Sequence, residues 1–150
     1  MSVGEFAPSE MPAKPMLIGL VGLPYSGKST IARKMDVPIV CPDEIRLAMH
    51  GHRFIPEAEG MVWAIAHIMV NALFGAGHTK VVLDSCNASR KRRMEWEGSS
   101  VYDVFWTPVR TPMDVCIERA FAEDDEEIIP IIQRMNEAWD VPAVGEAWPT

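Results

Sequence analysis

Near its start the chain contains the segment Gly22-Leu-Pro-Tyr-Ser-Gly-Lys-Ser-Thr30, which fits the pattern G-x-x-x-x-G-K-[ST]. Gly22 and Gly27 allow a tight backbone whose N–H groups point inward, so an anionic polyphosphate can lie at the start of the next helix. Lys28 is expected to reach the β and γ phosphates, and Ser29 to offer its hydroxyl oxygen to Mg²⁺. The residues predicted to bind a nucleotide are Gly22, Leu23, Pro24, Tyr25, Ser26, Gly27, Lys28, Ser29 and Thr30.

Acidic side chains follow two further apolar runs. Asp84 ends the run Val81-Val82-Leu83, where it could hold Mg²⁺ through a water or orient an acceptor, although a strand-terminal Asp is also a common turn residue. Asp43 and Arg46 are three apart at the start of a predicted helix, on one face. The carboxylate could take a proton from an attacking hydroxyl while Arg46 holds a phosphate. An ordinary helix-start acid with a surface ion pair fits these two residues equally well.

These residues need a scaffold that brings them together, and the chain alternates strand and helix patterns. Strands are predicted at 16–21, 37–41, 79–83 and 101–106, and helices at 42–50, 57–75, 89–97, 112–122 and 130–139. Strands separated by helices pair in parallel, so we expect an α/β protein with a three-layer α/β/α sheet of about four strands. In such sheets ligands bind at the carboxyl ends of the strands, where the candidate residues fall.

Length and composition fit a single globular domain. The 150 residues are 48% hydrophobic and carry a net charge of −7, which argues against coating nucleic acid by charge alone but permits a local basic groove. We predict a disordered leader at 1–15, one domain at 16–142 and a tail at 143–150. The three cysteines have no metal-binding or paired spacing, so reduced thiols and a cytoplasmic location are expected. The apolar stretch 61–74 is interrupted by His67 and Asn71 and is too short to span a bilayer, so no membrane role is predicted.

The chain resembles the P-loop polynucleotide kinases, meaning the kinase domain of phage 5′-hydroxyl polynucleotide kinase and its bacterial relatives. The resemblance covers about 16–142 and rests on G-L-P-Y-S-G-K-S-T, C-P-D-E-I-R, V-V-L-D-S-C-N with Arg92, Arg93 and Trp96 after it, and I-I-P-I-I-Q-R-M-N-E-A-W. It implies the P-loop NTPase fold with a short lid, ATP (or GTP) as phosphate donor, and Mg²⁺. It also implies that Asp43 is the general base, that Arg46 contacts an acceptor phosphate, and that Asp84, Ser85 and Asn87 help to hold the acceptor.

The lid departs from this family. Arg119 precedes it, but the run 123–127 consists of five acids where a further arginine is expected. Acids cannot stabilise a migrating phosphoryl group, so Arg119 acts alone, Arg134 assists it, or the lid is degenerate. The acids themselves are predicted to form a solvated loop.

The only basic cluster is Arg90-Lys-Arg-Arg93, and Trp96 follows it. Cations beside an aromatic ring can hold a single strand, so Arg93 is a predicted acceptor-binding residue; a basic helix face that balances an acidic protein is the alternative. His67 and Asn71 lie four apart on the long helix. They could line an acceptor cleft, although a buried pair is the preferred interpretation.

The leading hypothesis is a kinase that moves the γ-phosphate of ATP to a hydroxyl of a nucleic acid or nucleoside, with Lys28, Asp43, Arg46 and Arg119 as catalytic residues and Ser29 and Asp84 at the metal. The expected acceptor is a 5′-hydroxyl end of DNA or RNA, or a hydroxymethyl group on a modified base in phage DNA. A small-molecule kinase and a non-catalytic nucleotide-binding module are the alternatives. The oligomeric state is left open.

Overall fold

The computed structural model describes residues 13–51 and 53–140. The predicted tail at 143–150 and all but the last three residues of the predicted leader lie outside this part of the chain. A parallel sheet with the strand order β2-β3-β1-β4 forms the centre. The strands are β1 (Met16–Val21), β2 (Ile39–Val40), β3 (Lys80–Leu83) and β4 (Asp103–Pro108). The predicted α/β fold with four parallel strands is therefore confirmed.

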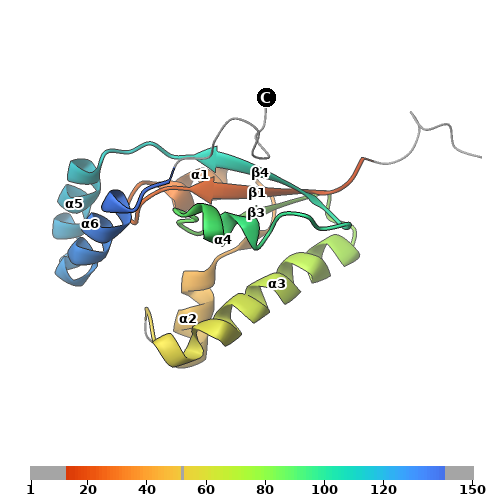
Figure 1. Ribbon diagram of the computed structural model, residues 1–150, viewed down its shortest axis with the longest axis horizontal. Coiled ribbons are helices and arrows are strands. Elements are labelled where there is room, and N and C mark those ends of the chain that lie inside the picture. The colour runs from red at the N-terminus through yellow and green to blue at the C-terminus, as the bar shows by residue number, and fades with distance from the viewer. Residues whose placement is uncertain (1–12, 52, 141–150) are drawn as a thin grey trace, which may run out of the picture.

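Six helices connect and flank these strands in the part of the chain that is described (Figure 1). They are α1 (Lys28–Lys34), α2 (Pro42–His50), α3 (Glu59–Gly75), α4 (Arg90–Met94), α5 (Met113–Ala122) and α6 (Ile129–Glu137), and short 3-10 turns precede α3 and α6. Two predicted elements are shorter than expected. The second strand has two residues, and the charged helix ends at Met94 instead of reaching Glu97.

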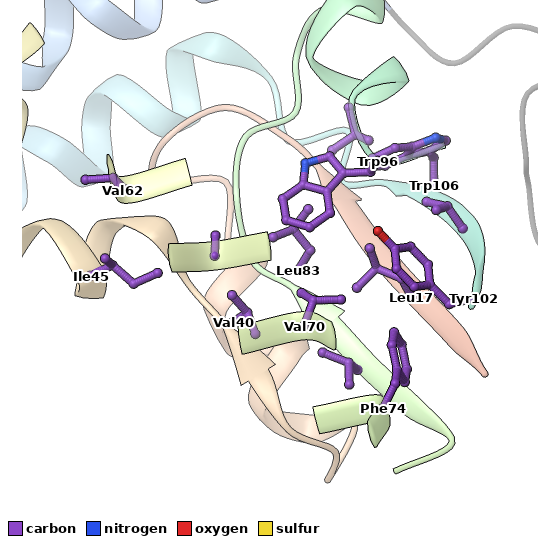
Figure 2. Close-up of a cluster of buried hydrophobic side chains, with 14 residues drawn as sticks. Leu17, Val40, Ile45, Val62, Val70, Phe74, Leu83, Trp96, Tyr102 and Trp106 are labelled. Carbon is purple, nitrogen blue, oxygen red and sulfur yellow. The ribbon is translucent and has the colours of Figure 1, made fainter. Parts of the chain in front are cut away.

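The alternation of β1 side chains between the two faces of the sheet explains the layers. Ile18 and Leu20 pack with Ala32 of α1 on one face. Leu17 and Val21 pack on the other face, against α3 and the two tryptophans Trp96 and Trp106 (Figure 2). Because both faces are covered, β1 is buried along most of its length, and the loop that follows it starts from a fixed position.

Helix α3 is the long apolar helix of the sequence. Together with the preceding 3-10 turn it spans 20 residues with mean hydropathy 1.3, which is long and apolar enough by composition to cross a membrane. The prediction that this stretch is too short to span a bilayer is therefore wrong. Its Val62, Ala66, Val70 and Phe74 are buried at intervals of four residues and pack on the sheet. This stripe is the pattern of a core helix.

Helices α5 and α6 lie together beyond the carboxyl ends of β1 and β4, while α2 and α3 lie together beside the sheet (Figure 1). A second core of Cys116, Ala120, Ile128 and Ile132 joins α5 and α6 to Leu23 of the loop after β1. The loop is thus packed against α5 and α6.

Candidate functional site

The phosphate loop has the backbone that its sequence predicts. Gly27 lies at φ 95° immediately before α1, where an L-residue with a side chain would be strained. Gly22 is restricted for a different reason, since a Cβ there would lie 2.6 Å from Ser26 Oγ. The Gly22 N–H donates to the carbonyl of Cys86 at 3.0 Å, which joins the loop to the segment after β3. Lys28 is buried and donates from Nζ to the Leu23 carbonyl at 2.7 Å, so its ammonium lies over the loop.

The two predicted metal residues contact each other. Ser29 Oγ donates to Asp84 Oδ2 at 2.7 Å, because α1 begins and β3 ends at the same edge of the sheet. A hydroxyl and a carboxylate are the hard oxygen donors that Mg²⁺ accepts together with nucleotide phosphates and waters. Within residues 13–51 and 53–140 no group of three or more His, Cys, Asp or Glu side chains could hold a metal by itself. The site therefore fits a Mg²⁺ ion that arrives with its nucleotide.

Asp43 and Arg46 contact each other, as their spacing predicts, with Arg46 Nη1 donating to Asp43 Oδ1 at 2.7 Å. Sequence reasoning missed a third partner: Glu59 of α3 accepts from Arg46 Nε at 2.8 Å and from Nη2 at 2.7 Å. This hydrogen bonding lowers the pKa of Glu59. The Asp43 side chain is 68% exposed whereas that of Arg46 is 13% exposed. Arg46 is thus held by two carboxylates while Asp43 stays accessible.

Two of the residues after β3, Ser85 and Asn87, line the main cavity. Asn87 is buried, adopts φ 48°, and donates from Nδ2 to the carbonyls of Leu20 at 2.7 Å and Ser85 at 3.2 Å, while its buried Oδ1 has no partner among the described residues. Asn87 therefore braces the segment that carries Asp84, and its predicted contact with an acceptor stays a prediction.

The predicted basic rail is wrong for Arg93 and Trp96, although Arg92 of the same cluster lines the cavity. Arg93 is 0% exposed, and its Nη1 donates to the carbonyls of Asn87 at 3.0 Å and Asp140 at 2.7 Å. Trp96 is also 0% exposed and belongs to the core. Since α4 ends at Met94, the chain turns the Trp96 ring inward toward the sheet. Arg93 consequently does not line the cavity and anchors the loop after β3.

An aromatic ring does stand beside cations, at Trp63 of α3. Arg92 Cζ lies 4.2 Å from the Trp63 ring centroid, and Arg46 Cζ lies 5.8 Å from it. The three side chains come from α2, α3 and α4, so only the folded chain brings them together. Sequence reasoning missed Trp63, which reads as one more apolar residue of the long helix.

His67 and Asn71 do not line the cavity. His67 stacks on Trp96 at a centroid distance of 3.7 Å, and burial lowers its pKa. Asn71 is exposed and donates back to the His67 carbonyl. The expected buried pair is therefore found only in part. Among the thiols, burial raises the pKa of Cys41 to about 11, which agrees with a reduced and unreactive cysteine.

Helix α5 and the acidic run 123–127 that follows it each contact the phosphate loop at one point. Arg119 Nη1 donates to the Tyr25 carbonyl at 3.1 Å, next to Gly27. Tyr25 Oη donates to Asp125 Oδ2 at 2.8 Å, and Asp125 also binds the guanidinium of Arg53. Asp125 is thus not the solvated acid that the sequence predicted. It links the lid to both the phosphate loop and the segment before α3.

One cavity of about 1510 Å³ is lined by the phosphate loop from Pro24 onward, by the Ser29–Asp84 and Asp43–Arg46 pairs, and by Arg119. It is lined by seven cationic residues and four acidic ones, although the whole protein carries a net charge of −7. The cations are Lys28, Arg33, Arg46, Arg53, Arg92, Arg119 and Arg134. The local basic groove that the composition permitted is therefore present, and it joins the phosphate loop to the Asp43–Arg46 pair.

No family model and no curated protein matches the chain. Among solved structures, a chain of the Pnkp1/Rnl/Hen1 complex is 28% identical with a TM-score of 0.64, over 73% of this chain and 40% of that one. In a structure of the Pnkp1/Rnl/Hen1 RNA repair complex the identity is 23% and the TM-score 0.68, over 97% and 54% of the two chains.

A gluconokinase from Sinorhizobium meliloti 1021 is 18% identical with a TM-score of 0.62, over 91% of this chain and 82% of that one. This protein therefore spans about half or less of the first two relatives but most of the gluconokinase. The likenesses confirm the P-loop kinase fold, support a P-loop phosphotransferase, and agree with the resemblance to polynucleotide kinases.

Proposed function

We propose that the protein is a kinase that transfers the γ-phosphate of ATP to a hydroxyl of a nucleic acid, with the 5′-hydroxyl of a DNA or RNA end as the favoured acceptor. The observation that carries this proposal is the single basic cavity that the phosphate loop shares with Asp43 and Arg46. A nucleotide-binding module without an acceptor would not need the cationic Arg46 and the accessible Asp43 carboxylate in the same cavity as the loop. The likeness to a chain of an RNA repair complex supports the same acceptor class.

The residues around the cavity have different roles in this reaction. The N–H groups of the loop and Lys28 bind the donor phosphates, and Mg²⁺ held near Ser29 and Asp84 would neutralise charge on them. Asp43 accepts the proton of the attacking hydroxyl, since its carboxylate is largely exposed to the cavity. Arg46 uses the N–H groups that Glu59 and Asp43 leave free to hold a phosphate of the acceptor. Arg119 of α5 reaches the phosphate loop, near which charge develops during transfer.

A small-molecule kinase is the second candidate, because the gluconokinase matches most of this chain in fold. Salt dependence separates the two. Binding of a polyanionic acceptor to several arginines weakens steeply as salt rises, whereas a neutral metabolite responds little.

The test is transfer of labelled γ-phosphate from ATP with Mg²⁺ to four acceptors in parallel: 5′-hydroxyl single-stranded DNA and RNA, hydroxymethyl-pyrimidine DNA with blocked ends, and free nucleosides. We expect label on a 5′-hydroxyl end, and a fall of about 10²- to 10⁴-fold in Asp43→Asn with ATP affinity retained. Glu44→Gln is the matched control, since Glu44 is the exposed neighbour and does not line the cavity. ATP binding without label on any acceptor would refute the proposal.

A further inference from the structure

Trp63 has the surroundings of a ligand platform. The ring is half-buried and lines the cavity. It makes an edge-to-face contact with Trp96, whose ring centroid lies 6.4 Å away at an interplanar angle of 65°. Arg92 covers the ring at 4.2 Å and is itself anchored by an ion pair to Glu95 at 2.9 Å. Ring and guanidinium therefore form two layers of a stack.

This stack is not closed on its outer side. The Arg92 side chain is 38% exposed and lines the same cavity as Trp63. Planar guanidinium groups stack on nucleobases as well as on tryptophan. Arg92 therefore offers a flat, cationic surface on which one more planar group can continue the stack.

Arg46 links the stack to the reaction. It binds Asp43 through Nη1 and at the same time lies 5.8 Å from the Trp63 centroid. An acceptor whose hydroxyl reaches Asp43 thus has its neighbouring groups close to Trp63 and Arg92. A nucleoside carries a planar base on the same sugar as its 5′-hydroxyl, whereas gluconate-like metabolites carry no planar ring.

We infer that Trp63 and Arg92 form a stacking platform for the base of the nucleotide that presents its 5′-hydroxyl to Asp43. The inference rests on the proposed function and makes the terminal base, not only the phosphates, a recognised part of the acceptor. Stacking tolerates every base, so the platform selects ends that carry a base without selecting its sequence.

The experiment compares two acceptors that differ in one group: a 5′-hydroxyl oligonucleotide with an intact terminal nucleotide and the same oligonucleotide with an abasic one. Stacking on a protein surface predicts a preference of about 5- to 150-fold in kcat/KM for the intact end. Arg92→Lys keeps the charge but removes the plane, so it should lower kcat/KM for the intact end and leave the abasic end unchanged. Trp63→Leu should act in the same way, and Trp63→Phe should retain part of the preference.

The control is Lys91→Gln, because Lys91 is exposed on the same helix and does not line the cavity. Equal transfer to both ends by the unaltered protein would overturn the platform and leave the kinase intact. An equal loss on both ends in Arg92→Lys would also overturn it, since Arg92 would then act through its donors on phosphate. Absence of transfer to either end, with ATP bound, would instead refute the proposed function and the platform with it.

Discussion

Arg53 and Asp125 bind each other although 72 positions separate them in the chain, with Arg53 Nη1 2.9 Å from Asp125 Oδ1. Tyr25 of the phosphate loop donates to the same carboxylate. One acid thus connects the segment before α3, the donor loop and the lid. Each of these three segments contributes residues to the lining of the cavity, so the contact joins three parts of its wall.

The first prediction concerns the stability that this contact provides. Hydrogen bonding from Arg53 lowers the pKa of Asp125 below its ordinary 3.8, burial opposes this, and the Tyr25 hydroxyl lowers the pKa further. The stabilisation is therefore complete above pH 3.8 and is lost as the pH falls through the lower, folded-state pKa. Asp125→Asn should reduce the free energy of unfolding at neutral pH by about 1 kcal/mol, given that Arg53 is partly exposed.

Urea unfolding at neutral and acidic pH measures this difference. The difference in the free energy of unfolding between Asp125→Asn and the unaltered protein should become smaller as the pH is lowered. Asp124→Asn is the control, because Asp124 is exposed and its positive φ of 54° suits asparagine. A difference in the free energy of unfolding that stays constant with pH would show that the ionised carboxylate does not cause it.

The sequence predicted the parts of this molecule that depend on local pattern and on topology. The phosphate loop, β1 and α2 have the expected bounds or nearly so, and parallel strands bring Ser29 to Asp84 because their carboxyl ends share one edge. These features follow from periodicity and from the rule that strands joined by helices run parallel.

The parts that could not be predicted depend on how helices pack. Glu59 reaches Arg46 only because α2 lies against α3, and Trp63 meets Arg92 only because α4 is placed beside α3. The prediction that Arg93 binds an acceptor failed for another reason. A guanidinium is expected at the surface, but backbone carbonyls satisfy it in the interior, which no local pattern reports.

The second prediction tests Glu59 as a positioning residue for Arg46. Glu59→Gln removes the charge that fixes the guanidinium in a bidentate pair, leaving Asp43 as its only carboxylate partner among the described residues. The KM for a 5′-hydroxyl oligonucleotide should rise about 10-fold, with the KM for ATP unchanged. Steady-state kinetics with each substrate varied in turn measure this. Glu57→Gln, an exposed acid two residues earlier, should behave as the unaltered protein, and equal effects on both KM values would contradict the assignment.

The third prediction concerns the Ser29–Asp84 pair, whose oxygens lie 2.7 Å apart. Asp84→Asn keeps the shape but removes the charge that a divalent cation needs. The Mg²⁺ concentration for half-maximal transfer should therefore rise by about 10-fold or more. A Mg²⁺ titration at saturating ATP measures the shift, with Asp114→Asn on the exposed side of α5 as control. An unchanged Mg²⁺ requirement with a lower kcat would point to a role for Asp84 toward the acceptor instead.

The last prediction concerns whether a lid with five acids still catalyses. Arg119 already touches the phosphate loop through the Tyr25 carbonyl, whereas Asp125 is bound to Arg53 and Tyr25 and does not line the cavity. If Arg119 supplies the positive charge in the transition state, Arg119→Lys should lower kcat by about 10²-fold or more with little change in the KM for ATP. Arg110→Lys, exposed and outside the cavity lining, should have no effect. A kcat that survives Arg119→Lys but falls in Arg134→Lys would transfer this role to the last helix, whose Arg134 lines the same cavity.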